Sequence, residues 1–307
     1  MIEVKNLKKT YDNREALKGI SLAIDEGEFY GLLGPNGAGK TTTISILSSI
    51  LELDSGEVII DNQNIEMQPK EVKKLIGVVP QEIALYEELS AYENLMFWGG
   101  LYEVPKNELS SRATELLKLF GLDQRKNDKI KNYSGGMKRR VNIASALLHQ
   151  PKVLFMDEPT VGIDPQSKNL IFEVVEKLHK QGMTIVYTTH YMEEAERFCD
   201  RIGIIDDGKI IAEGTLDELR NSSSVKETIA ITFLNLNDMD VKEISAFWGD
   251  MKQIENTVHF YSLNVKSDLS KLVLQCNQLG LEITNIEILK MNLETIFLKL
   301  TGKQLRD

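Results

Sequence analysis

The sequence of 307 residues contains only two cysteines, Cys199 and Cys276, which lie far apart in the chain. Two separate cysteines are too few for a disulfide framework or a cysteine-based metal site. We therefore expect both to be buried, reduced thiols of a cytosolic protein.

Long apolar runs are also missing. No run approaches the roughly 18 residues that a membrane-spanning helix needs, and the start, Met1 to Lys5, lacks the apolar core of a secretory signal. Positive charge is scarce, with 36 Lys and Arg against 46 Asp and Glu and a formal net charge of −10. We therefore expect no span of the bilayer by this chain and no general binding of nucleic acid, although a local basic patch stays open.

What is present is the composition of a globular protein and one informative loop. Hydrophobic residues make up 42% of the chain, whose length suits one large or two ordinary domains. Gly34 to Thr41 matches the phosphate-binding pattern G-x-x-x-x-G-K-[ST]. An apolar run, 29–33, precedes it, and helical spacing of apolar residues follows over 42–51. Strand, turn and helix N-terminus surround an anion with backbone N–H groups.

The loop therefore predicts a nucleotide site. Lys40 would reach the β- and γ-phosphates, and the Thr41 hydroxyl would ligate Mg²⁺. The predicted contacts of this loop are Gly34, Pro35, Asn36, Gly37, Ala38, Gly39, Lys40, Thr41 and Thr42.

A second candidate follows four apolar residues, Val153 to Met156, which end in Asp157 and Glu158. A buried parallel strand has this pattern, and its carboxyl end points into the crevice where α/β sheets bind ligands. Asp157 would hold Mg²⁺ through its water shell, and Glu158 would orient or deprotonate the attacking water. The alternative is a strand that ends in a solvated acidic turn, which the phosphate loop makes the weaker interpretation.

A third candidate is Ser134-Gly135-Gly136, where Ser134 is a plausible N-cap for a helix that runs through Leu148. The two glycines leave backbone amides bare at that helix end, which forms a second anion-binding site. The chain needs only one such site for its own nucleotide. A phosphate could be sandwiched if a second copy of the chain supplied this surface.

At this point the sequence resembles the ATP-binding cassette (ABC) family of transporter ATPases. Ser134-Gly135-Gly136 matches the family signature, which contacts the γ-phosphate bound to the opposite subunit. Tyr133 and Met137 stand where the family usually has Leu and Gln. The Ser-Gly-Gly core is intact, whereas the contribution normally made by the Gln side chain is not carried over.

The resemblance covers roughly residues 1–220 and implies further site residues. Tyr11 matches the aromatic residue that stacks on adenine, and Gln81 matches the glutamine that senses Mg²⁺ and the attacking water. Asp164 matches the carboxylate of the dimer-contact loop, and His190 matches the switch histidine near the γ-phosphate. The catalytic set is then Glu158, His190, Gln81 and Lys40, and the metal set is Thr41, Gln81 and Asp157.

The predicted fold is α/β: a P-loop ABC cassette over 1–220, with a parallel-sheet core, an antiparallel β part and a helical subdomain at about 85–148. Within that subdomain, residues 91–98 are rich in aromatic side chains. They form a local core, or some of them line a groove for a helix of a membrane partner, as the resemblance implies.

A polar run, 221–224, predicts a linker to a small α/β domain over 225–307. That domain has no evident chemistry of its own, and a ferredoxin-like arrangement suits its pattern. Its last stretch, 292–302, resembles ATPases of the antibiotic-resistance export branch. The expected strands are 228–233, 257–261 and 281–288, and the expected helices are 241–248, 268–279 and 292–300.

Two functions stay open at this stage. The favoured one is an ATP-hydrolysing subunit that drives export of a drug, antibiotic, peptide or lipid by a separate membrane permease. The other is a soluble ABC-type ATPase that acts on ribosomes or DNA, against which the single cassette and the lack of a long heptad array or basic tail argue. The resemblance implies ATP and Mg²⁺ as cofactors, a dimer with a second copy or a homologous ATPase, and a place on the cytoplasmic face of the cell membrane. ATP binding would close the dimer and hydrolysis would reopen it.

Overall fold

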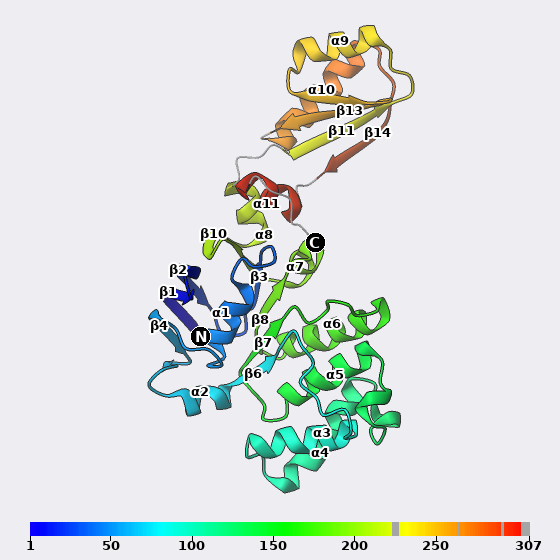
Figure 1. The fold of residues 1–307 in the computed structure, drawn as a ribbon. Helices are drawn as coiled ribbons and strands as arrows, with labels where there is room; N and C mark the ends of the chain where they lie inside the picture. Colours follow the sequence, from blue (N-terminus) through cyan, green and yellow to red (C-terminus); the bar gives the residue numbers. More distant parts are fainter. Residues whose placement is uncertain (223–226, 263, 290–291, 302–307) are drawn as a thin grey trace. The chain divides into compact units, whose positions relative to one another are not determined.

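The computed structural model describes residues 1–222, 227–262, 264–289 and 292–301 (Figure 1). The chain divides into two compact units, Met1–Leu216 and a second that begins at Asp217. Asn221 and Ser222 belong to helix α8 (Leu216–Ser222) rather than to a linker, because the helix continues through them. The rest of the predicted linker, 223–224, lies outside the described residues.

The first unit opens with a four-stranded antiparallel sheet. Along β1, Ile2 and Val4 are buried while Glu3 and Lys5 are exposed, the two-residue period of a strand with one covered face. The strands pair in the order β2-β1-β4-β5. Their bounds are β1 (Ile2–Tyr11), β2 (Arg14–Ile24), β4 (Ser55–Ile60) and β5 (Gln63–Asn64).

A second sheet of six strands follows the order β10-β9-β3-β8-β7-β6. Strands β9 to β6 in this order are parallel, and β10 pairs antiparallel with β9. Every residue of β3, β7 and β8 is buried, as expected for parallel strands with both faces covered. The strands are β3 (Phe29–Leu33), β6 (Ile76–Val79), β7 (Val153–Asp157), β8 (Thr184–Thr189), β9 (Arg201–Asp206) and β10 (Lys209–Gly214).

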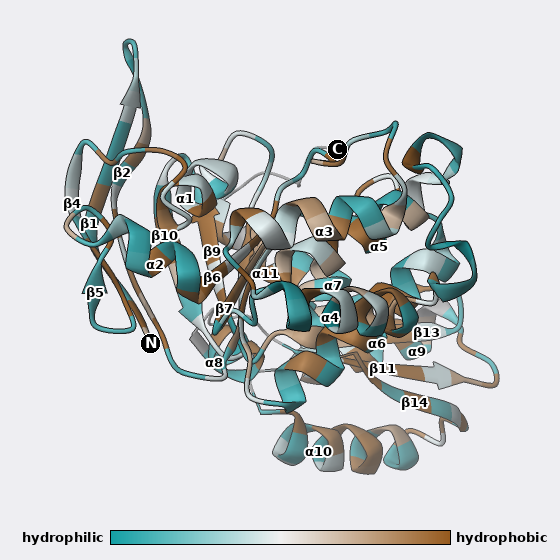
Figure 2. Ribbon diagram, turned by 90° about the horizontal axis from the view of Figure 1, so that it is seen from below, coloured by the Kyte–Doolittle hydropathy of each residue, from teal (hydrophilic) through white to brown (hydrophobic). Residues whose placement is uncertain are grey.

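Two cores cover the two faces of this sheet. Phe155 of β7 packs with α1 and the antiparallel sheet, whereas Leu154 and Met156 pack with α6 and the helical subdomain. Alternate residues of one strand therefore serve different cores. Figure 2 shows hydrophobic residues along β6, β7 and β9. The helices around the sheets are α1 (Lys40–Leu47), α2 (Pro69–Leu75), α6 (Pro165–Lys180) and α7 (Met192–Phe198).

The helical subdomain consists of α3 (Ala91–Leu101), α4 (Lys106–Leu119) and α5 (Gly135–Ala146), with 3₁₀ turns at Asp123–Arg125 and Ile130–Asn132. Two alternatives were predicted for the aromatic segment on α3, a local core and an exposed groove for a partner helix. Some of its side chains are buried and others are exposed. Leu95 is buried and Trp98 packs partly against the core, but Phe97 is 39% exposed. Phe97 lies edge-on to the exposed ring of Tyr86, with ring centroids 4.8 Å apart.

The second unit has the element order β-α-β-β-α-β, and its antiparallel sheet runs β12-β13-β11-β14. This is the ferredoxin-like arrangement that the sequence pattern suits. The strand over 251–254 was not predicted, and Gly302 of the last predicted stretch lies outside the described residues. The elements are β11 (Glu227–Phe233), α9 (Asp238–Phe247), β12 (Met251–Ile254), β13 (Thr257–Ser262), α10 (Val265–Gln278), β14 (Ile283–Leu289) and α11 (Leu293–Thr301).

Both cysteines are free thiols. Cys276 is buried in the core of the second unit, where burial raises its pKa to about 11, and Cys199 is partly exposed. Among the described residues, no helix combines the length and the apolar character that crossing a membrane requires.

Candidate nucleotide site

The phosphate loop joins β3 to α1. Gly37 and Gly39 have φ values of 79° and 114°, which non-glycine residues rarely adopt. A Cβ on Gly34 would lie 2.2 Å from the backbone oxygen of Ile205, so only glycine fits there. Gly39 is the N-cap of α1 and supplies no side chain, which leaves the first backbone N–H groups of the helix available to an anion.

Lys40 is held at the start of α1 by three oxygen atoms. Its Nζ donates to the backbone oxygens of Gly34 at 2.8 Å and Pro35 at 3.1 Å, and it lies 3.0 Å from Glu158 Oε1. The side chains of Lys40 and Glu158 are 4% and 6% exposed. The cation is therefore fixed over the loop in a site of low water access, where its charge acts strongly.

Glu158 stands directly after β7 in an unusual backbone conformation. Its φ is 43°, in the left-handed region. Its N–H donates to the Thr188 hydroxyl at 2.9 Å, and that hydroxyl donates to Asp157 Oδ1 at 2.6 Å. The second carboxylate oxygen of Glu158 lies 3.2 Å from His190 Nδ1. Strand ends of β7 and β8 therefore bring two acids and one imidazole to the same edge of the sheet.

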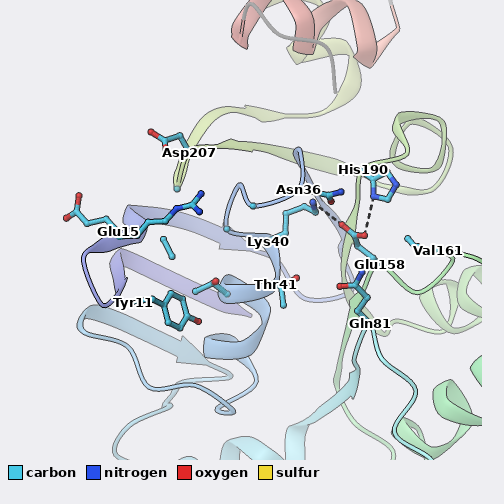
Figure 3. Close-up of a pocket in the computed structure, with 16 residues that line it drawn as sticks. Tyr11, Glu15, Asn36, Lys40, Thr41, Gln81, Glu158, Val161, His190 and Asp207 are labelled. Carbon is cyan, nitrogen blue, oxygen red and sulfur yellow. Dashed lines mark hydrogen bonds and ion pairs between the residues drawn. The ribbon is translucent and has the colours of Figure 1, made fainter. Parts of the chain in front are cut away.

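A pocket of about 600 Å³ opens over this edge (Figure 3). In Figure 3 the Lys40, Glu158 and His190 side chains are linked by dashed lines, Gln81 lies beside Glu158, and the Tyr11 ring lies on the far side. Tyr11 is 47% exposed, which suits a ring that offers one face to a flat base. The predicted residues that line the pocket are Tyr11, Asn36, Gly37, Gly39, Lys40, Thr41, Thr42, Gln81, Glu158 and His190.

Other predicted residues do not line this pocket. Gly34, Pro35 and Ala38 belong to the phosphate loop but are not in the lining. Asp157 directly precedes Glu158 at the end of β7, is 4% exposed and accepts a hydrogen bond from the Thr188 hydroxyl. The pocket also contains residues that were not predicted as site residues. Most of them come from the start of β2 and from the β9–β10 turn, and Val161 comes from the loop between β7 and α6. These are Arg14, Glu15, Ala16, Val161, Asp207 and Gly208.

The donors predicted for Mg²⁺ are of the right type. Thr41, Gln81 and Asp157 offer hydroxyl, amide and carboxylate oxygens, which are the ligands of hard cations. No group of three or more His, Cys, Asp or Glu side chains able to hold a metal is found in the described part of the chain. Mg²⁺ in nucleotide sites usually binds one or two carboxylates together with phosphate oxygens, so this donor set fits such an ion.

Ser134-Gly135-Gly136 lies apart from the pocket. Ser134 caps α5, and its Oγ accepts the Met137 N–H at 3.3 Å. Ser134 and Gly135 are exposed, and a Cβ on Gly135 would meet nothing within 4 Å. Gly136 is buried against Asp164 and Ser167 at the start of α6. The bare helix end is therefore exposed and lies outside the nucleotide pocket of its own chain.

Asp164 has a structural role in addition to the one predicted. It caps α6, and its Oδ1 accepts the Ser167 N–H at 2.9 Å. Hydrogen bonds from Ser167 lower the pKa of the Asp164 carboxyl. The side chain stays ionised and fixed beside Gly136, on the same surface as the bare end of α5.

A buried acid that the motifs did not predict lies behind His190. Glu194, 3% exposed, accepts hydrogen bonds from the hydroxyls of Thr160, Tyr187 and Thr189 at 2.5–2.9 Å. Lys168 of α6 lies 2.5 Å from the same carboxylate. This network joins the end of β8 to the segment that leads into α6. Three hydroxyl groups and one ammonium surround the Glu194 carboxylate, so this side chain supports the shape of the site.

Comparisons with known proteins agree on one family. Residues 17–161 match the family described as "ABC transporter". The linearmycin resistance ATP-binding protein LnrL of Bacillus subtilis (strain 168) is 44% identical over 318 residues, covering 100% of both chains. The doxorubicin resistance ATP-binding protein DrrA of Mycobacterium tuberculosis (strain ATCC 25618 / H37Rv) is 35% identical, covering 98% of this chain and 93% of that protein.

Solved structures give the same result for the first unit. The dimeric ATP-binding cassette MJ0796, bound to ADP and phosphate in a post-hydrolysis state, superposes with a TM-score of 0.65 and 33% identity. The superposed region covers 70% of this chain and 99% of the MJ0796 chain. A structure described as the ATP-binding subunit of an ABC transporter reaches a TM-score of 0.67 at 32% identity, covering 72% of this chain and 92% of that one.

Proposed function

The chain belongs to the ABC transporter family of ATP-binding proteins, and we propose that it powers export of an antibiotic or drug through a separate membrane permease. It is an ATPase and a dimeric cassette of the antibiotic and drug resistance branch. One observation carries the assignment of its catalytic centre. The Glu158 carboxylate sits between Lys40 and His190 at the mouth of the phosphate loop.

Each side chain of this centre has a proposed role toward ATP, the attacking water or Mg²⁺. The loop amides and Lys40 bind the phosphates, and Tyr11 supports the base. Glu158 orients the attacking water and accepts its proton, while His190 holds the carboxylate in place. When bound, Mg²⁺ neutralises charge on the phosphate oxygens, with Thr41, Asp157 and Gln81 as the side chains that would hold it directly or through water.

The second anion-binding helix end supports a shared site. Since Ser134 and Gly135 are exposed and do not line the pocket of their own chain, they are available to the nucleotide of a partner copy. Each site would then use the phosphate loop of one copy and the α5 N-terminus of the other. Contacts to the γ-phosphate from both sides favour the closed dimer, and hydrolysis removes them.

A permease partner is supported by apolar exposure on α3 and the loop before it. Tyr86, Phe97 and Leu101 are 50%, 39% and 61% exposed. This aromatic surface lies on the helical subdomain, which places it where a short helix of a membrane protein could bury it. The ATPase would then act at the cytoplasmic face of the membrane.

The substrate class rests on relatives whose names refer to resistance to linearmycin, daunorubicin and doxorubicin. Residues of the nucleotide site do not contact the transported compound, so the permease selects it. The test is copurification with a membrane protein of a neighbouring gene as the candidate permease, followed by ATPase assays in lipid vesicles. We expect antibiotics of the linearmycin or anthracycline type to stimulate hydrolysis. A permease-bound ATPase that responds to none of them, while sugars or amino acids stimulate it, would contradict the proposal.

A further inference from the structure

Two side chains of helix α5, Arg139 and Asn142, form hydrogen bonds with the main chain around Gln81, and neither belongs to the predicted catalytic set. Arg139 is 3% exposed, and its Nη1 donates to the Pro80 backbone oxygen at 2.6 Å. Its Nη2 donates to the Gln81 backbone oxygen. One turn further on, Asn142 Oδ1 accepts the Ala84 N–H at 3.3 Å. The main chain is thus held on both sides of Gln81.

Burial of the Arg139 guanidinium lowers the stability gained from this contact, so stability alone does not account for an arginine here. Burial lowers the pKa of Arg139, partly offset by the negative charge of Asp157 nearby. Within the described residues, Arg139 Nε and Asn142 Nδ2 are buried and have no hydrogen-bond partner. Removing a cation from water has a large cost in free energy, and well-packed apolar side chains often stabilise a core equally well. A role in holding Gln81 explains why an arginine occupies this position.

The geometry also explains why arginine suits this position. Gln81 is exposed and follows the end of β6, so burial of its own side chain does not fix its position in the pocket. A planar guanidinium can bond two neighbouring carbonyl groups at once, whereas a lysine ammonium is a single point charge. Arg139 therefore sets the direction in which Gln81 leaves the strand.

We propose that Arg139 is a positioning residue, which holds the main chain at Gln81 so that the amide side chain reaches the nucleotide pocket. Asn142 supports it from the next turn of α5. The same helix begins at Ser134-Gly135-Gly136. A displacement of α5 by a partner copy bound at this end would therefore also move the helix that holds Gln81. This inference rests on the proposed catalytic role of Gln81.

The test compares Arg139→Met with a matched control, Arg112→Met. Arg112 also donates a guanidinium hydrogen bond to a backbone oxygen, that of Leu148 at 3.2 Å, but makes no contact with the Gln81 segment. We expect Arg139→Met to lower kcat for ATP by about ten- to a hundredfold, as misplacement of a catalytic group does. The dissociation constant for ATP stays unchanged, and Arg112→Met keeps both values.

A double-mutant cycle with Gln81→Ala separates positioning from folding. In the Gln81→Ala background, Arg139→Met should cause no further fall in kcat. An equal loss in both backgrounds, or full activity of Gln81→Ala alone, would overturn the inference while the ATPase function stands. A wild-type chain without ATP hydrolysis would overturn the proposed function as well.

Two further measurements keep the test decisive if Arg139→Met folds poorly. Arg139→Lys retains the charge and one donor group, so its kcat should fall between wild type and Arg139→Met and show the same non-additivity. Hydrogen exchange should accelerate in a peptide that spans 80–84 in either variant, with no change over 34–41. Unchanged exchange at 80–84 in a folded Arg139→Lys protein with normal kcat would count against the inference.

Discussion

Lys40 Nζ and Glu158 Oε1 lie 3.0 Å apart in a buried ion pair that joins the phosphate loop to the end of β7. The proposed mechanism gives the two groups separate tasks toward ATP, Lys40 with the phosphates and Glu158 with water. A γ-phosphate that reaches Lys40 competes with Glu158 for the same ammonium. Binding of ATP would therefore free Glu158 Oε1 for the attacking water while Oε2 keeps its contact with His190, so the base is restrained until substrate arrives.

The first prediction concerns Glu158→Gln. The amide keeps the size of the side chain but cannot accept the proton of water, so turnover should nearly vanish while ATP binding is retained. The loss of hydrolysis should also trap a nucleotide-bound dimer, which size-exclusion chromatography with ATP and Mg²⁺ would detect. Glu103→Gln is the control, because Glu103 is exposed and shares the left-handed backbone, with φ of 58°. Wild-type turnover in Glu158→Gln would remove this residue from the catalytic role.

Lys40→Ala should weaken ATP binding itself. A buried, charge-assisted contact to phosphate is typically worth about 1.5–3 kcal/mol, or roughly ten- to a hundredfold in affinity. Titration with a fluorescent ATP analogue measures the change. Lys152→Ala is the control, since Lys152 pairs with Asp61 in a largely exposed contact at 2.7 Å. An unchanged dissociation constant in Lys40→Ala would contradict the assignment.

Local sequence identified the phosphate loop and the two acids, because each motif depends on a strand end and a short turn. The contact between Lys40 and Glu158 was beyond such reasoning, since it depends on the order of strands in the sheet. The same holds for Asp207 and Gly208, which reach the pocket because the β9–β10 turn lies against β2. The Gly208 N–H donates to the Ala38 backbone oxygen at 2.9 Å, a contact with no local sequence signal.

Mixed dimers test whether Ser134 acts across subunits. Ser134→Arg and Lys40→Ala chains should each be nearly inactive alone. In a heterodimer one site combines both defects and the other has neither, so ATPase activity should partly return, up to one intact site in each heterodimer.

Crosslinking controls for the formation of heterodimers. If crosslinked heterodimers show neither rescue of hydrolysis nor one intact ATP-bound site, the shared site is wrong. A dead mixture that still binds one ATP in each heterodimer would indicate strict coupling between the two sites.

The two signature glycines give a matched pair of substitutions. Gly136→Ala should destabilise the fold by about 1–3 kcal/mol, the usual cost of overpacking, because its Cβ would lie 2.2 Å from Ser167 Oγ. Gly135→Ala meets nothing within 4 Å and should leave the melting temperature unchanged. It should nevertheless reduce ATPase activity, since the added methyl group stands where a partner's phosphate must approach. Equal melting temperatures for both variants would disprove this packing.

The second unit shows where sequence patterns fail. Strands β11 and β13 were predicted from their alternating apolar residues, which face one core. Strand β12 was not, because three of its four residues, 252–254, are exposed, so no burial pattern marks it. The linker prediction over 221–224 was wrong for Asn221 and Ser222, because Asn and Ser favour turns in general whereas these two residues continue helix α8.

The left-handed backbone at Glu158 sets a second requirement at this position, independent of its carboxylate. Residues branched at Cβ are strongly disfavoured at φ near 43°, whereas asparagine, aspartate and glycine tolerate it. In a library randomised at codon 158, a variant must therefore meet two requirements. Its side chain must tolerate the left-handed backbone so that the protein folds, and it must be able to accept a proton from water so that ATP is hydrolysed. Variants that meet only the backbone requirement are expected to fold and bind ATP without hydrolysing it.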